Sequence, residues 1–159
     1  MKNLLNIVRK ILIPGGGWLP SLVLITHIFL SRVLHVHALW PPTDILIHFL
    51  GGVAIAFFVS RCFQILPRGS IKRSRVVVLE LLLIGSLTAT AAVCWEFGEF
   101  IADRLFGSYL QTSLEDTMID LAMGVFGGVL FMLIRSWQLR VGTRELREIT
   151  LEWVRGYVT

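Results

Sequence analysis

The chain has 159 residues, of which 55% are hydrophobic and only 16% are charged, and its formal net charge is +4. Soluble domains usually carry about 25% charged residues, because less polar surface than this cannot cover a core. The composition excludes a soluble enzyme, a disordered chain and a free nucleic-acid-binding protein. It predicts an all-α, polytopic membrane protein.

The first predicted element is an amphipathic helix at the membrane interface, over residues 1–13. Lys2 and Arg9 lie on its polar face, and Leu4 and Ile11 lie on its apolar face. A basic polar face opposite an apolar face is typical of helices that lie on a bilayer. A proline and three glycines then end the helix.

Four apolar runs follow, and each is long enough to cross a membrane as a helix of about 20 residues. We expect a bundle of four transmembrane helices, over residues 18–39, 44–66, 76–100 and 117–134, in a membrane domain over residues 18–137. Tryptophans near the ends of the runs resemble an aromatic belt; they are Trp18, Trp40, Trp95 and Trp137. A last amphipathic helix is predicted over residues 143–157, at the cytoplasmic side of the membrane.

The basic residues predict how the bundle is oriented. Thirteen of the 15 Lys and Arg residues lie on one side of the four runs, and only Arg32 and Arg104 lie on the other. Since the positive side is cytoplasmic, we expect a multi-pass protein of the bacterial cytoplasmic (inner) membrane, with both termini in the cytoplasm. The lipid bilayer is its expected partner, nucleic acid is not, and the sequence leaves the oligomeric state open.

Acidic residues gather on the opposite, outer side, and helical spacing groups them on helix faces. Glu96 and Glu99 share a face of the third run, and Asp120 lies on a face of the fourth run that continues into glycines. His48 lies about one turn inside the second run. These four residues (His48, Glu96, Glu99 and Asp120) are the predicted metal ligands. Glu96 or Glu99 is the candidate catalytic general base.

The chemistry of these ligands favours a divalent metal, because carboxylates with one imidazole suit Mg²⁺, Mn²⁺, Fe or Zn²⁺. Asp44, Asp103 and Asp116 are expected at the rim of the site. Small residues on the same helix faces predict close helix packing, through Gly51, Gly124, Gly127 and Gly128.

Simpler interpretations compete for several of these residues. Asp44 can stabilise a helix N-terminus through the helix dipole. Asp116 follows Ser113 at the spacing of a capping box. Asp103 is expected to be solvated. His27, alone in an apolar run, is expected to be a hydrogen-bonded packing residue rather than a ligand.

The order and spacing of these motifs resemble the VanZ-like superfamily, and most closely the uncharacterised YjdF-like inner-membrane proteins. The resemblance covers residues 43–128. It rests on the motifs Asp44-x3-His48-Phe49, Trp95-Glu96-x2-Glu99 and Asp116-Thr117-x2-Asp120-Leu121-x5-Gly127. Gly124 departs from the family pattern, which has Asn there. The resemblance implies a small multi-helix membrane fold with a shared polar site, and it implies no particular reaction.

Three functions remain open from the sequence. The first is a protein with a metal site near the outer leaflet, acting on an envelope lipid or a lipid-linked amphiphile. The second is a proton- or cation-translocating protein, since intramembrane acids often mark such pathways. The third is a structural or accessory membrane subunit without catalysis, whose acids hold helices together. Whether the protein is an enzyme is left open.

Overall fold

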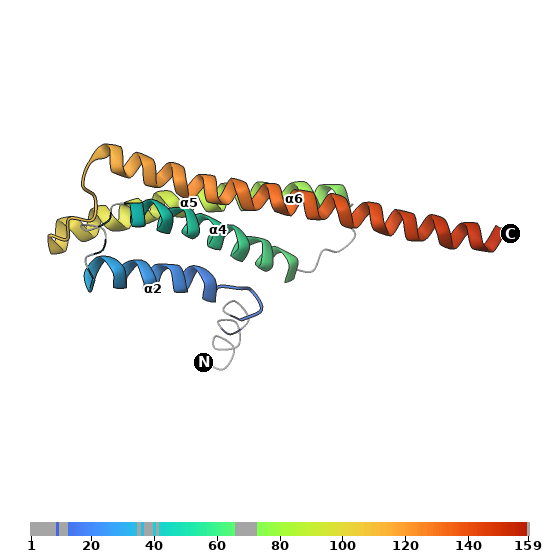
Figure 1. The fold of residues 1–159 in the computed structure, drawn as a ribbon, viewed down its shortest axis with the longest axis horizontal. Coiled ribbons are helices and arrows are strands. Elements are labelled where there is room, and N and C mark those ends of the chain that lie inside the picture. Colours follow the sequence, from blue (N-terminus) through green and yellow to red (C-terminus); the bar gives the residue numbers. More distant parts are fainter. Residues whose placement is uncertain are drawn as a thin grey trace.

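The computed structural model describes residues 9, 13–34, 36, 40, 42–65 and 73–158, with the side chains of residues 73 and 142–158 left aside. The regular structure of these residues is helical throughout. The helices are α2 (Trp18–Arg32), α4 (Pro42–Ile65), α5 (Arg73–Phe106) and α6 (Leu114–Val158) (Figure 1). The all-α prediction is therefore confirmed.

Three of these helices are long and apolar enough to cross a membrane, namely residues 42–65, 74–106 and 114–141. The apolar helix α2 is shorter than predicted. It ends at Arg32 after 15 residues, or about 22 Å, against the roughly 30 Å of a hydrocarbon core. Within the predicted span over residues 18–39, α2 therefore covers residues 18–32, and residues 35 and 37–39 lie outside the described residues.

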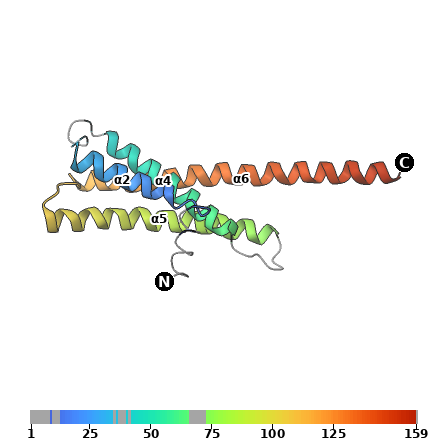
Figure 2. The ribbon, with the colours of Figure 1, turned by 90° about the horizontal axis from the view of Figure 1, so that it is seen from below.

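Of the two predicted surface helices, only the C-terminal one has a backbone that the structure describes throughout. Residues 143–157 are helical, but they continue α6 without a break, so that α6 extends well beyond the other helices (Figures 1 and 2). The sequence has a glycine at the junction, Gly142, but no proline, and α6 continues through this glycine. The amphipathic helix expected over residues 1–13 lies almost entirely outside the described residues.

Helix α4 lies at the centre of the bundle, where it packs against α2, α5 and α6. Its contact with α6 is a close approach of two backbones. A Cβ atom on Gly52 would overlap the carbonyl oxygen of Gly124, and one on Gly127 would overlap the carbonyl oxygen of Phe49. Only glycine allows helices to come this close.

The packing residue on α4 is Gly52 rather than Gly51, which the sequence singled out. A Cβ on Gly51 would lie 3.9 Å from Trp95 and 4.0 Å from Val23, which is ordinary van der Waals contact. Consecutive residues of a helix point about 100° apart, so Gly52 faces α6 while Gly51 faces α5 and α2. On α6, Gly128 is close to Thr88 of α5.

The interior of the bundle is more polar than its surface. The buried described residues include ten polar or charged ones, against only five hydrophobic ones, while large apolar side chains are exposed along every helix. On α5 the buried positions recur about every four residues and therefore form one face; they are Val76, Glu80, Ile84, Thr88, Glu96 and Glu99. This distribution fits a bundle whose outer surface contacts lipid.

One buried ion pair joins three helices away from the predicted site. Arg135 of α6 donates from Nε to Oε1 of Glu80 on α5 at 2.8 Å. Ser60 of α4 donates to the same oxygen at 2.8 Å. Because these partners compensate the buried charge of Glu80, this contact serves to fix the helices against one another.

Candidate metal centre

Six ionisable side chains from four helices meet at one end of the bundle. We call them the acid–histidine cluster; its members are His27 of α2, Asp44 and His48 of α4, Glu96 and Glu99 of α5, and Asp120 of α6. All six are buried. They lie at the end where α5 turns into α6 and α2 leads towards α4 (Figure 1).

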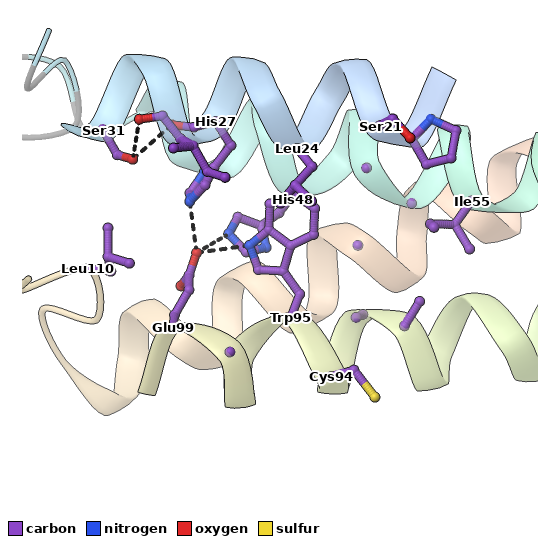
Figure 3. Close-up of a pocket in the computed structure, with 18 of the residues that line it drawn as sticks. Ser21, Leu24, His27, Ser31, His48, Ile55, Cys94, Trp95, Glu99 and Leu110 are labelled. Carbon is purple, nitrogen blue, oxygen red and sulfur yellow. Dashed lines mark hydrogen bonds and ion pairs between the residues drawn. The ribbon is translucent and has the colours of Figure 1, made fainter. Parts of the chain in front are cut away.

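Glu99 is the most heavily contacted carboxylate of the cluster. Its Oε1 accepts a hydrogen bond from Nε1 of Trp95 at 2.9 Å. The same oxygen lies 3.2 Å from Nε2 of His27 and 3.6 Å from Nε2 of His48. Figure 3 shows these contacts converging on Glu99 from α2 above and from the centre of the site.

His48 has a carboxylate oxygen near each of its ring nitrogens. Its Nδ1 lies 3.4 Å from Oε1 of Glu96, and its Nε2 lies 3.6 Å from Oδ1 of Asp44. Asp44 in turn lies 3.8 Å from Nδ1 of His27. The rings of both histidines pack edge-on against Trp95, with centroid distances of 5.2 and 5.5 Å. The histidines are therefore held in place by aromatic as well as charged neighbours.

Three polar atoms of the cluster lack a hydrogen-bond partner among the described residues. They are Oε1 of Glu96, Oδ1 of Asp120 and Nε2 of His48, all fully enclosed. The exposed fractions of these residues are 6%, 2% and 5%. A buried polar atom without a partner is costly, so the cluster as it stands is short of donors or of positive charge.

The distances between imidazole nitrogens and carboxylate oxygens in the cluster are close to those between the ligand atoms of one metal ion. Ligands bound at 2.0–2.2 Å in tetrahedral geometry lie about 3.3–3.6 Å from one another. The closest contacts between imidazole nitrogens and carboxylate oxygens span 3.2–3.8 Å. In three overlapping groups the ligand atoms all lie within 4.8 Å of one another; the groups are His27–Asp44–Glu99, Asp44–His48–Asp120 and His48–Glu96–Glu99.

The structure brings together the four residues that the sequence proposes as ligands, His48, Glu96, Glu99 and Asp120. Asp44, expected at the rim, lies inside the cluster instead. It is in the first turn of α4, where the dipole also favours an acid, but its side chain turns inward toward both histidines.

The other two acids expected at the rim lie outside the cluster. Ser113 caps α6, since its Oγ accepts a hydrogen bond from the backbone N–H of Asp116, and Oδ2 of Asp116 accepts one from the backbone N–H of Thr112, both at 3.1 Å. Asp116 therefore belongs to the capped first turn of α6, although its side chain reaches the backbone N–H of Thr112 rather than that of Ser113 as in a capping box.

The sequence led us to expect a solvated Asp103; in the structure this residue is half-buried and organises the loop between α5 and α6. Its carboxylate accepts hydrogen bonds from Ser108 Oγ and from the backbone N–H groups of Leu110 and Gln111, at 2.6–2.9 Å. Gln111 then donates to Oε2 of Glu96 at 2.9 Å. Asp103 therefore positions a ligand of the cluster through the loop.

Sequence reasoning missed two residues of the site. The sequence assigns His27 to packing, as a histidine in the middle of an apolar run, and only the tertiary arrangement of α2 on α4 brings it to the site. Trp95 was assigned to the aromatic belt, although its indole donates to Glu99. Its spacing of four residues from Glu99, one helical turn, was the available signal.

A cleft of about 680 Å³ opens beside the cluster, between α2 and α5 and in front of α4 (Figure 3). His27, His48 and Glu99 line its polar end. Its other walls are mostly apolar or small; they include Leu24, Ile28, Ile55, Ala91 and Gly98. Leu24 and Ile28 are 44% and 50% exposed, so the cleft is open to the lipid-facing side of the bundle.

A family model described as "Predicted membrane protein (DUF2238)" matches residues 16–140. No curated protein and no solved structure matches the chain. The resemblance to VanZ-like and YjdF-like proteins receives no support from these comparisons. Because the match covers most of the sequence, the chain belongs to the DUF2238 family of predicted membrane proteins.

Proposed function

We propose that this member of the DUF2238 family uses the acid–histidine cluster to hold a divalent metal ion and acts with it on an envelope lipid or a lipid-linked amphiphile. The observation that carries the proposal is the burial of four carboxylates and two imidazoles in three overlapping groups of three, with the ligand atoms of each group within 4.8 Å of one another. Their positions towards the ends of three long apolar helices and of α2 support a site near a membrane surface.

Charge balance supports a cation in this position. Asp44, Glu96, Glu99 and Asp120 would repel one another if all were ionised, and two histidines compensate at most two charges. A divalent ion compensates two further charges at once. It also gives a partner to the buried Oδ1 of Asp120, which makes no hydrogen bond among the described residues.

The presence of two imidazoles narrows the range of metals. With His48 alone, the ligand set suits Mg²⁺ as well as transition metals. His27 supplies a second nitrogen ligand, and imidazole favours Zn²⁺ or Fe, while carboxylates suit Mn²⁺. We therefore propose Zn²⁺, Fe²⁺ or Mn²⁺ rather than Mg²⁺.

The two glutamates on α5 have different surroundings and are assigned different roles. Glu99 is held by Trp95 and both histidines, which suits a fixed ligand. Glu96 is held through Oε2 by Gln111, while its Oε1 lacks a hydrogen-bond partner among the described residues. Glu96 is therefore our choice for the general base. The metal would polarise a phosphoryl or carbonyl oxygen of the amphiphile or activate a water molecule.

The amphiphile is inferred from the location of the cleft. Its polar end includes cluster residues, and its apolar walls reach the surface that faces lipid. A substrate with an apolar part could therefore reach the cluster from within the bilayer without crossing an aqueous path.

The orientation proposed with this function places the cluster on the outer side of the cytoplasmic membrane. We expect a cysteine introduced at Tyr109, an exposed residue of the loop between α5 and α6, to react with a membrane-impermeant maleimide on intact spheroplasts. A cysteine introduced at Thr159 should react only after lysis. The opposite labelling pattern would place the cluster on the cytoplasmic side and refute the orientation.

The function can be tested through the lipids of the cell. In a strain lacking the protein, mass spectrometry of total envelope lipids should show at least one species changed in amount. Wild-type protein should restore that species and Glu96→Gln should not, although Glu96→Gln should insert and accumulate normally. Glu115→Gln, at an exposed acid of the first turn of α6, should restore it fully and serves as the control.

Full restoration by Glu96→Gln would show that the carboxylate has no chemical role. The cluster would then be a structural element that joins four helices.

A further inference from the structure

We infer that the cleft between α2 and α5 binds one long hydrocarbon chain, with a phosphate headgroup at its polar end. This inference rests on the proposed function and specifies the class of amphiphile. The cleft, rather than the acid–histidine cluster, carries the inference.

The first argument is the distribution of polarity along the cleft. Arg32, Ser31 and the cluster residues His27 and Glu99 line one end. Towards the other end, the walls are mostly apolar and small side chains; Figure 3 places Ile55 there together with Ser21, whose hydroxyl donates to the backbone carbonyl of Gly17. A ligand that matches both ends must itself be polar at one end and apolar along the rest.

The second argument is the direction and length of the cleft. Its lining residues on α2 include Ser21 and Arg32, which are about 16 Å apart along the helix at 1.5 Å per residue. Half of a hydrocarbon core is about 15 Å. Arg32 is the last residue of α2 and Ser21 lies in its first turn, so the cleft follows most of the helix. A lipid of the adjacent leaflet would therefore fit with its headgroup at the membrane surface and its chain pointing inward.

The third argument is the shape of the wall on α5. A Cβ atom added to Gly98 would meet nothing within 4 Å, and Ala91 and Ala102 also line the cleft. These small residues leave a shallow wall along which a flexible chain can lie. The cleft's volume of about 680 Å³ is in the usual range for pockets that bind small ligands, about 300–1,000 Å³.

The charges indicate the headgroup. Arg32 provides a guanidinium group, which pairs well with phosphate oxygens. An anionic headgroup would be repelled by bare carboxylates, but a divalent metal in the cluster would remove that repulsion and offer a further partner. We therefore assign the polar end to a phosphate rather than to a cationic or a neutral headgroup.

The test is equilibrium binding of radiolabelled hexadecyl phosphate to purified, metal-loaded protein in detergent micelles. Gly98→Leu fills the cleft from α5 and should weaken binding by at least about tenfold, because a chain-binding pocket loses its space. Leu24→Trp fills the cleft from α2 and should also weaken binding of the probe. Ala122→Leu adds similar bulk at an exposed position of α6 outside the cleft and should bind as the wild type does.

The headgroup is tested with two competitors and one variant. Neither hexadecanol nor inorganic phosphate should displace the probe as well as unlabelled hexadecyl phosphate does. Arg32→Gln should weaken binding about tenfold, since it removes a charge-assisted hydrogen bond. Equal competition by inorganic phosphate would show a simple anion site, and equal competition by hexadecanol would show a groove without headgroup recognition; either result overturns the inference.

The inference also fails if Gly98→Leu and Leu24→Trp both bind the probe as tightly as the wild type, or if the wild type does not bind it. Measuring the metal content of each sample distinguishes a failure of this inference from a failure of the proposed function. Metal-containing protein that does not bind the probe refutes the lipid cleft and leaves the metal centre intact. If the protein contains no metal, and Gly98→Leu still weakens its binding of hexadecyl phosphate, the metal centre is refuted and the lipid cleft stands.

Discussion

Gly52→Ala should prevent normal packing of α4 on α6 and sharply reduce the amount of folded protein. The new Cβ atom would overlap the carbonyl oxygen of Gly124, which belongs to backbone and cannot rotate away as a side chain would. Overpacking in a tight interior typically costs about 1–3 kcal/mol, and a clash with backbone belongs at the upper end of that range. We expect a large loss of monodisperse protein in size-exclusion chromatography and a lower midpoint of thermal unfolding.

Gly51→Ala is the matched control for this prediction. It makes the same chemical change one residue earlier on the same helix, but its Cβ atom would lie 3.9 Å from Trp95, in ordinary contact. This variant should therefore unfold at the temperature of the wild type or slightly above it, because alanine favours a helix more than glycine does. Equal behaviour of the two variants would refute the close approach of α4 and α6.

Glu99→Gln should weaken divalent-metal binding by more than about 100-fold, because even changes to residues that only support a ligand cost 10–100-fold. The substitution removes the negative charge but keeps the shape of the side chain. Its amide oxygen can still accept from Trp95, so we expect the variant to remain folded. The measurement is competition for Zn²⁺ or Mn²⁺ against a chromogenic chelator, with the protein in detergent.

The control for Glu99→Gln is Glu115→Gln, which removes an acid of the same type at an exposed position in the first turn of α6. It should bind metal as the wild type does. If both variants bound metal equally well, the metal would be held elsewhere or by nonspecific attraction to acids, and the assignment of Glu99 would be wrong.

Much of the fold could be predicted from the sequence, because hydropathy and helix periodicity act locally. The apolar runs of the three long helices needed no tertiary information. The acidic residues inside the predicted spans could also be identified, because Glu96, Glu99 and Asp120 interrupt apolar runs in which a charged side chain is energetically unfavourable. Their grouping with His48 followed from counting turns inward from each helix end.

Features that depend on how helices face one another could not be predicted in the same way. His27 is the one histidine of the apolar helix α2, and its position opposite Glu99 depends on how α2 packs on α4. Gly51 and Gly52 are indistinguishable by composition, and only the rotation of α4 determines which one contacts α6. Asp103 lies four residues after Glu99, on the same face of α5. The loop after Gly107 nevertheless turns back, and its backbone N–H groups donate hydrogen bonds to the carboxylate of Asp103.

The metal content of wild-type protein, purified without added metal and measured by elemental analysis, tests the central claim most directly. We expect about one divalent transition-metal ion per chain, since the cluster offers two imidazoles and four carboxylates to such an ion. That metal should be absent from Glu99→Gln purified in parallel. Wild-type protein that contains no metal, and takes up none after incubation with Zn²⁺, Mn²⁺ and Fe²⁺ in turn, would contradict the account.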